Sequence, residues 1–332
     1  MIKLFRQLNP LNLLVLAGLL LLLRMPSILI THLPDSTTEF DTLVVEFPFL
    51  ETIRNLFTAE VLQIIACVVI YVQALLLNRI IHQYSLLTKP SHLPALMYVV
   101  CSNLLVPFLP FRIVLLGNFF TIWLIKKNIE LYRKSSAQMV VFDMGMLIAM
   151  GTYLYVPFLI VFPLSVISLL IFRSFNWREW IALPLGVLAI FIPIFTYYKL
   201  NHSEDILAEK FKFLKIIPHF YIAVGWQEYL ILLPIMLVLV LSIIRLRHNF
   251  WKSYVLVRKF FQFLLIMLPF VGMSCYWATN VLSHFLLCMP ALSVYMAYYF
   301  LNVERRWVYE SLFGLIIVVL IYLRFSTLFL FG

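Results

Sequence analysis

The segment between residues 32 and 55 concentrates carboxylates. Asp35, Glu39 and Asp41 lie within seven residues of one another, and no Lys or Arg follows them before Arg54. Neighbouring carboxylates can bind a divalent cation, or one of them can act as a general base toward an acceptor hydroxyl. The alternative is that the segment is acidic only because it lies outside a membrane that retains positive charge inside. These three acids are the candidate catalytic residues, with a divalent cation as the candidate cofactor.

Three arginines lie near the predicted outer ends of apolar segments, namely Arg24, Arg54 and Arg112. A guanidinium group can hold a phosphate or pyrophosphate through two parallel hydrogen bonds, so these are the candidate lipid-phosphate-binding residues. The alternative is that each side chain extends along apolar surface to reach the headgroup layer.

Two further ionisable residues fall inside apolar stretches. His284, in SHFLLCMPALSVYMAYY, is a further candidate site residue near the outer end of a segment, with a hydrogen-bonded core histidine as the alternative. Asp143 could couple to proton movement, but the basic cluster from Lys126 to Lys134 favours an ion pair or a helix amino-terminal interaction. The four cysteines stand in apolar segments without CxxC spacing, so neither a disulfide framework nor a metal site is indicated.

The composition determines which elements must position these residues. Hydrophobic residues make up 64% of the chain, charged residues 12%, and the mean hydropathy is +1.00. Such segments in lipid must satisfy their own backbone hydrogen bonds, which predicts an all-α, multi-pass bundle of transmembrane helices. The formal net charge of +10 is spread along the loops rather than gathered in one patch, so we expect the lipid bilayer as partner and no nucleic acid.

The distribution of Lys and Arg predicts about eleven spans with the amino terminus in the cytoplasm. The run before the first loop lacks a small-residue cleavage site and is expected to stay as an uncleaved span. About thirty uncharged residues separate Asp143 from Arg173, which is right for two short spans with a turn near Tyr153 to Pro157. The predicted spans are Leu11–Leu23, Leu56–Leu77, Leu93–Leu109, Phe111–Ile125, the two short ones, Trp180–Tyr198, Glu228–Ile244, Phe260–Cys275, Trp277–Leu301 and the stretch from Trp307 to the carboxyl end.

This topology predicts one integral membrane domain over residues 1–332 in a bacterial inner membrane. Segment 32–55 becomes a periplasmic acidic loop. Segment 199–220 has apolar residues at helical spacing and is predicted to be an amphipathic helix on the periplasmic surface. The short loops leave flat apolar helix faces that could meet membrane protein partners.

Two stretches resemble landmarks of the GT-C superfamily, the membrane glycosyltransferases that use polyprenyl-phosphate sugars. MGMLIAMGTYLYVPFLIVFPLSVISLL is similar to their short glycine-containing span with a re-entering partner, and SHFLLCMPALSVYMAYYF is similar to a late span that there begins with Arg-Tyr. The resemblance implies a polyprenyl-phosphate-linked sugar as substrate, and a catalytic carboxylate in the first outer loop at Asp35, Glu39 or Asp41. Here Phe40 separates Glu39 from Asp41, and Ser283-His284 stands in place of Arg-Tyr.

A likeness along nearly the whole chain is carried by NRIIHQYSLLTKPSHLPALMYV, FDMGMLIAMGTYLYVPF and FRSFNWREWIALPLGV. These segments resemble an uncharacterised inner-membrane family of Bacteroidota, and that family implies no activity. Three functions therefore stay open: a GT-C-like glycosyltransferase, a non-catalytic subunit or scaffold of an envelope or secretion complex, and a transporter. A transporter needs interrupted spans, for which the region around Pro157 and Pro163 is the candidate.

Overall fold

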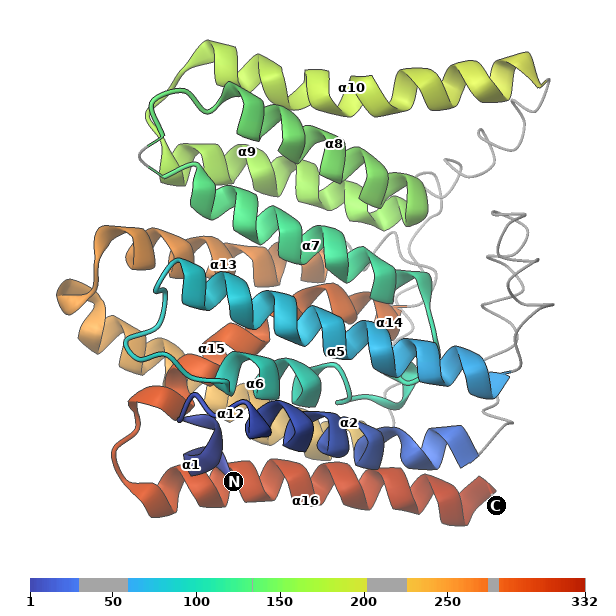
Figure 1. The fold of residues 1–332 in the computed structure, drawn as a ribbon, viewed down its shortest axis with the longest axis vertical. Helices are drawn as coiled ribbons and strands as arrows, with labels where there is room; N and C mark the ends of the chain where they lie inside the picture. The colour runs from blue at the N-terminus through green and yellow to red at the C-terminus, as the bar shows by residue number, and fades with distance from the viewer. Residues whose placement is uncertain (30–58, 133, 202–225, 274–280, 332) are drawn as a thin grey trace. The chain divides into compact units, whose positions relative to one another are not determined.

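The structure is a computed structural model that describes residues 1–29, 59–132, 134–201, 226–273 and 281–331, and all regular elements within those residues are helical (Figure 1). The prediction of an all-α chain is confirmed over this part. The helices fall into two compact units. Unit 1 comprises residues 1–115, 222–253 and 289–332, and unit 2 comprises residues 116–221 and 254–288. The single membrane domain proposed from the sequence stays a prediction.

Unit 1 is built around two short buried helices, α6 (Leu93–Cys101) and α15 (Met289–Asn302). All nine residues of α6 are buried, because α2, α5 and α15 pack against it from different sides. Helix α12 covers α15, and α16 contacts both α12 and α2. The remaining elements of the unit are α1 (Ile2–Phe5), α2 (Leu11–Leu29), α5 (Ala59–Gln83), η1 (Val106–Phe108), α12 (Trp226–Asn249), η4 (Phe250–Lys252) and α16 (Arg306–Phe331).

Unit 2 is organised around the pairing of α8 (Gln138–Leu154) with α10 (Trp177–Leu200). Gly145 and Gly186 allow the two backbones to touch, because a Cβ atom on Gly145 would overlap the carbonyl oxygen of Leu183. Small residues at such crossings are typical of helix pairs in membranes. The other elements are α7 (Ile113–Glu130), of which residues from 116 onward belong to this unit, η2 (Val156–Ile160), α9 (Val161–Phe172), α13 (Val255–Met273), α14 (Val281–His284) and η6 (Phe285–Cys288).

Six described helical segments are long and apolar enough to cross a membrane: Glu60–Gln83, Trp177–Leu200, Leu230–Lys252, Val255–Met273, Phe285–Asn302 and Arg306–Leu323. Three shorter apolar segments accompany them, at Leu11–Ser27, Gln138–Leu154 and Val156–Phe172. The chain is thus a helical protein of membrane type. The described residues thus contain six candidate spans, and the count of eleven spans stays a prediction.

The predicted turn between the two short spans is confirmed. Helix α8 ends at Leu154, Tyr155 adopts an extended conformation, and the chain continues through η2 into α9. Pro157 lies in the first turn of η2, where its missing N–H leaves no helical hydrogen bond unmade.

The predicted span Leu93–Leu109 is not one continuous helix. Helix α6 stops at Cys101, and η1 follows after an irregular stretch. Pro107 lies in the first turn of η1 and Pro110 follows that turn, and neither can donate to a helical carbonyl, so a regular α-helix does not continue through these positions. The predicted span Trp277–Leu301 is likewise divided in its described part, into α14, η6 and α15.

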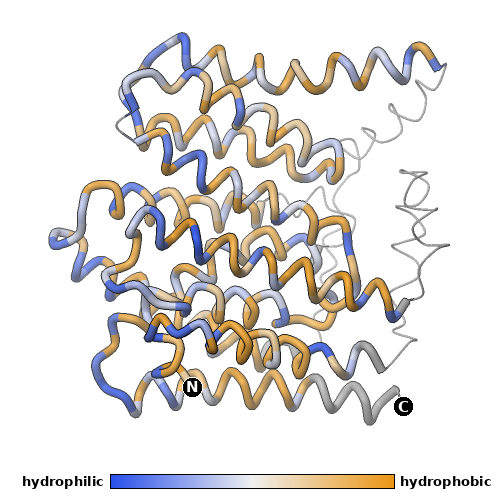
Figure 2. The backbone as a smooth tube through the Cα atoms, viewed as in Figure 1, coloured by the Kyte–Doolittle hydropathy of each residue, from blue (hydrophilic) through white to orange (hydrophobic). Residues whose placement is uncertain are grey.

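The hydrophilic termini of helices in unit 1 gather at one end, where Figure 2 shows polar residues beyond apolar helix bodies. The Arg6 guanidinium donates to the carbonyls of Phe300 and Val303, and the Arg245 guanidinium donates to Asn302. These contacts join the amino-terminal segment to the ends of α12 and α15. The three segments were predicted to share the cytoplasmic side, and the structure agrees that they share one side.

Candidate functional site

Arg24 lies in the interior of unit 1 and has no solvent exposure. Its Nε donates to Asn103 Oδ1 at 2.8 Å, and its two terminal nitrogens donate to the carbonyls of Leu109 and Phe108, each at 2.9 Å. A planar guanidinium can serve three acceptors that point in different directions, which a lysine ammonium on a flexible stem cannot match. Arg24 therefore fastens α2 to the irregular segment between α6 and α7.

The same hydrogen bonds explain how the irregular backbone between α6 and α7 can be buried in an apolar interior. Carbonyls outside a helix need other donors when they are buried, and each would otherwise cost several kcal/mol in the bilayer core. Arg24 supplies donors to two of them, and Asn103 Nδ2 donates to the carbonyl of Val99 at 2.7 Å. These three acceptors of Arg24 are neutral, and among the described residues no carboxylate forms an ion pair with it.

A second polar group lies in unit 1 on α5 and α6. The Tyr98 hydroxyl donates to Gln73 Oε1 at 2.9 Å, and Gln73 Nε2 donates to the carbonyl of Leu115 at 2.7 Å. Both side chains are buried. Buried hydrogen bonds of this kind fix the register of helices that apolar contacts alone would let slide.

The predicted site residues are only partly covered by the structure. Asp35, Glu39, Asp41 and Arg54 lie outside the described residues. Arg112 is described, buried at 5% exposure, and comes one residue before α7 begins. The structure thus brings Arg24 to the segment that ends at Arg112. It places the Arg24 side chain against protein carbonyls rather than toward the headgroup layer.

His284 belongs to unit 2 and is fully buried. Its Nε2 lies 3.2 Å from the carbonyl oxygen of Val271, and its Nδ1 lies 2.9 Å from the Tyr155 hydroxyl. A carbonyl only accepts, so Nε2 carries the proton, and in the neutral imidazole Nδ1 accepts from Tyr155. The two residues stand at the breaks after α8 and before η6, so this hydrogen-bonded pair ties two interruptions together. The core-histidine alternative fits this geometry.

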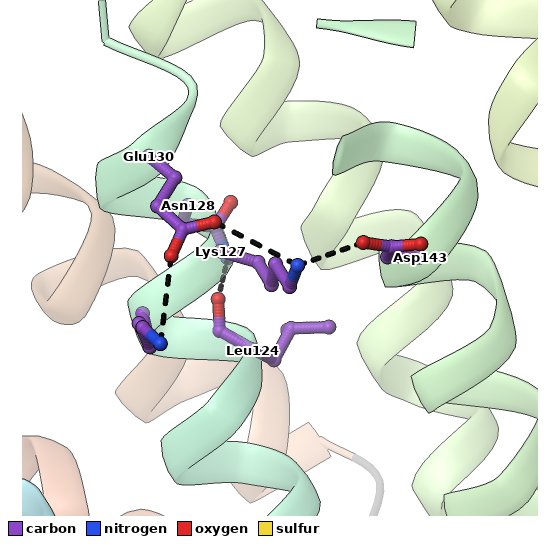
Figure 3. Close-up of polar contacts among 6 residues, drawn as sticks. Leu124, Lys127, Asn128, Glu130 and Asp143 are labelled. Carbon is purple, nitrogen blue, oxygen red and sulfur yellow. Dashed lines mark hydrogen bonds and ion pairs between the residues drawn. The ribbon is translucent and has the colours of Figure 1, made fainter. Parts of the chain in front are cut away.

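Asp143 forms the ion pair that the sequence favoured. Lys127 Nζ lies 2.7 Å from Asp143 Oδ2, and Glu130 lies 3.7 Å from both Lys126 and Lys127 (Figure 3). The side chain of Asp143 is 33% exposed, so this is a partly solvated pair that joins α7 to α8. It holds two helix ends together and needs no proton-coupling role.

Arg173 makes a second connection at the same end of unit 2. Its Nε lies 2.9 Å from Glu179 Oε2, and its Nη1 donates to the carbonyls of Leu131 and Lys134. Glu179 lies in the first turn of α10, where a carboxylate also benefits from the helix dipole. The Asn176 side chain caps this helix by accepting from the backbone N–H of Arg178 at 3.3 Å.

Sequence reasoning did not single out Asn103, Gln73 or Tyr155 as partners. Polar residues surrounded by apolar ones are the available signal, since Asn103 and Gln73 each interrupt a long apolar run. Which residues meet depends on how the helices pack. Among the described residues there is no group of three or more His, Cys, Asp and Glu side chains that could hold a metal ion.

Comparisons with known proteins place the chain in a family without assigning it an activity. No curated protein and no solved structure matches the chain. The model of one family matches residues 42–330, a range that includes Arg54, Arg112 and His284 and begins just after Asp41. Since this match covers most of the 332 residues, the chain belongs to that family, a family of unknown function (DUF6427).

Proposed function

We propose that this protein is a multi-pass protein of a bacterial inner membrane that handles a polyprenyl-phosphate-linked sugar at the periplasmic face, as a GT-C-like glycosyltransferase. The proposed arrangement has about eleven spans with a cytoplasmic amino terminus. Asp35, Glu39 and Asp41 are the proposed catalytic residues. Architecture alone does not assign an activity, so the proposal depends on how charge is placed in unit 1.

The observation that carries the proposal is the positive charge buried in unit 1. Arg24 is enclosed among neutral acceptors, and Arg112 is buried at the end of the segment that Arg24 holds. A charge in a low-dielectric interior acts on other charges more strongly than it would in water. The buried charge of Arg24 therefore favours an anionic group nearby, and a lipid-linked phosphate is an anion that a membrane supplies.

The position of Arg24 supports the connection to the acidic segment. Arg24 is five residues before the end of α2 at Leu29, and residues 30–58 join that end to the start of α5. Helices α2 and α5 pack against each other, so the two ends that this stretch connects belong to neighbouring helices (Figure 1). Asp35, Glu39 and Asp41 are thus part of the connection that follows α2, the helix that contains Arg24.

The proposed reaction is an inverting sugar transfer. A carboxylate of Asp35, Glu39 or Asp41 accepts the proton of the acceptor hydroxyl, whose oxygen forms a bond to the anomeric carbon while the bond to the lipid phosphate breaks. The phosphate leaves with the bonding electrons. Arg54 and Arg112 are the proposed direct phosphate contacts, and Arg24 contributes the field of a fixed charge while holding the segment that carries Arg112. A divalent cation, if the reaction uses one, would bind to the same carboxylates.

The test is the triple variant Asp35→Asn, Glu39→Gln and Asp41→Asn in the full chain, followed by analysis of lipid-linked sugars and surface glycans. The amide side chains keep the size of the carboxylates but cannot accept the proton, so we expect the lipid-linked sugar to accumulate. The matched control is Glu51→Gln, which removes an acid from the same segment outside the proposed site. Unchanged glycans and lipid-linked sugars in the triple variant would contradict catalysis.

A second candidate is a non-catalytic membrane subunit, and one observation favours it. Of the six candidate spans, α10 has the least buried apolar stretch, with 11% of an 18-residue window buried, and it exposes large apolar side chains along its length. Lipid or a partner helix must cover this face. Crosslinking from Leu188, which is 49% exposed, distinguishes the two: capture of one defined membrane protein supports the subunit, and capture of lipid alone does not.

A further inference from the structure

One end of unit 2 brings together three chain segments that are far apart in the sequence. Arg173 donates to the carbonyls of Leu131 and Lys134, so the α9–α10 loop lies against the α7–α8 connection. Lys259 Nζ lies 3.3 Å from the carbonyl oxygen of Phe172, so the first turns of α13 lie there too. All three segments are on the side that the sequence assigns to the cytoplasm.

The described acids at this end are already paired inside the unit. Glu179 is 2% exposed and bound to Arg173, Asp143 is bound to Lys127, and Glu130 lies between Lys126 and Lys127. Seven basic side chains and three acidic ones are described here, so the end carries an excess of positive charge. The basic ones are Lys126, Lys127, Lys134, Arg173, Arg178, Arg258 and Lys259.

Two of these basic side chains indicate what the excess positive charge could bind. Lys134 and Arg178 are exposed, and no described carboxylate forms an ion pair with either. They lie on the α7–α8 connection and in the first turn of α10, the two segments that Arg173 joins. A basic surface without bound acids attracts anions, and the attraction falls off within about 10 Å at ordinary salt.

Aromatic side chains accompany these cations. Phe175 is 73% exposed, Trp177 is 60% exposed, and Tyr254, at the start of α13, is 84% exposed. The Arg178 guanidinium carbon lies 5.6 Å from the centre of the Trp177 ring. Tyrosine and tryptophan beside basic residues are typical of the headgroup layer, where the rings meet lipid and the cations meet phosphate.

We propose that this basic-aromatic surface, formed by Lys134, Phe175, Trp177, Arg178 and Tyr254, binds the phosphate groups of acidic phospholipids in the cytoplasmic leaflet. The aromatic side chains enter the headgroup layer, and Lys134 and Arg178 contact phosphate. Phosphatidylglycerol and cardiolipin carry a net negative charge that phosphatidylcholine lacks, so acidic lipids are retained preferentially. The surface is independent of the proposed sugar transfer.

The experiment is lipid retention by the full chain, purified from an equimolar mixture of phosphatidylglycerol and phosphatidylcholine. Bound lipids are counted by native mass spectrometry. We expect the wild-type chain to retain phosphatidylglycerol in excess, and the double variant Lys134→Gln, Arg178→Gln to lose most of it, because each basic residue near an anionic surface is worth about a fivefold change in binding. Both side chains are exposed, so the variant should fold, which its thermal unfolding verifies.

Lys199→Gln is the matched control. It removes an exposed lysine from the last turn of the same helix α10 and should leave retention unchanged. Equal retention of both lipids by the wild-type chain, or equal loss in the control and the double variant, overturns the proposal. Inorganic phosphate should not displace the lipid; displacement would assign the surface to a soluble phosphate compound instead. Specific capture of an acidic protein with no lipid preference would likewise exclude the lipid assignment.

Discussion

The Arg24 guanidinium is the single group whose removal leaves the most buried polar atoms unsatisfied among the described contacts. Arg24→Met fills similar space but removes the donors to Asn103, Phe108 and Leu109. Buried acceptors that lose a charged donor cost about 1–3 kcal/mol each before relaxation, so we expect a loss of roughly 3 kcal/mol in the free energy of unfolding. Thermal or denaturant unfolding in detergent measures it.

Arg24→Lys separates charge from geometry. The lysine keeps the positive charge but cannot reach three divergent acceptors, so most of the loss should persist. Arg79→Gln is the control, because Arg79 is an exposed arginine of α5 and its change should stay within about 0.5 kcal/mol. If Arg24→Lys is as stable as the wild type, the three hydrogen bonds of the Arg24 guanidinium are not what holds the segment between α6 and α7.

His92 makes unit 1 sensitive to acid. Burial lowers the pKa of His92 below its ordinary value, and the nearby His82 ring lowers it further. Asn78 Nδ2 lies 3.3 Å from His92 Nδ1, which accepts this hydrogen bond only when it carries no proton. A folded pKa below the unfolded one means that stability present above about pH 6.5 is lost as the pH falls toward the folded pKa.

The pH dependence of unfolding between about pH 7 and pH 5 tests this assignment. The variant His92→Gln cannot take up the proton, so its stability should fall less steeply with acid than that of the wild type. His248 in the last turn of α12 has no such contact among the described residues, and His248→Gln serves as the control. Identical slopes in all three proteins would contradict the role given to His92.

At the scale of elements, the crossing of α8 and α10 depends on two glycines. A Cβ atom on Gly186 would overlap the carbonyl oxygen of Phe142, just as one on Gly145 overlaps Leu183. Backbone cannot yield as a flexible side chain can, so Gly145→Ala and Gly186→Ala should each force the helices apart and destabilise unit 2 by about 1–3 kcal/mol.

For Gly18→Ala in α2 we expect no loss of stability. Nothing lies within 4 Å of a Cβ atom at that position, so the helix propensity of alanine should make the variant equally stable or up to about 1 kcal/mol more stable. The melting temperatures of the three variants should therefore move in different directions. Losses of equal size at Gly18 and Gly145 would show that the contact is not the cause.

Two features of the helices in unit 2 were predicted correctly from the sequence. The uncharged stretch between Asp143 and Arg173 was too long for one span, and the break at Tyr155 confirms the inference. Asp143 faced a basic cluster, and the ion pair with Lys127 confirms that too. Both predictions depended on local sequence and on charge.

The interrupted segment after α6 was missed for a physical reason. Residues 102–109 are mostly apolar, and average hydropathy does not distinguish a helix from irregular backbone buried in protein. Its hydrogen bonds come from Arg24, which is about eighty residues away, and only the packed unit brings the two together. The sequence predicted Arg24 as a lipid-phosphate contact near the outer end of a span, because it does not reveal the buried carbonyls to which Arg24 donates.

At the scale of the whole molecule, charge organises both units in the same way. In unit 1 the amino-terminal segment and the ends of α12 and α15 share one end, joined through Arg6 and Arg245. In unit 2 three basic segments share one end, joined through Arg173 and Lys259. The Lys and Arg distribution predicts that all of these segments are cytoplasmic, and within each unit the segments that share this prediction also share one end.

Substituted-cysteine labelling in spheroplasts tests the orientation, and with it the site proposed at Asp35, Glu39 and Asp41, most directly. In a chain without its native cysteines, Ser36→Cys lies in the acidic segment, whereas Thr88→Cys and Ser135→Cys lie in the predicted cytoplasmic loops. The account predicts that a membrane-impermeant maleimide labels Ser36→Cys in intact spheroplasts and the other two only after permeabilisation. Labelling of Thr88→Cys and Ser135→Cys in intact spheroplasts, with Ser36→Cys protected, would contradict it.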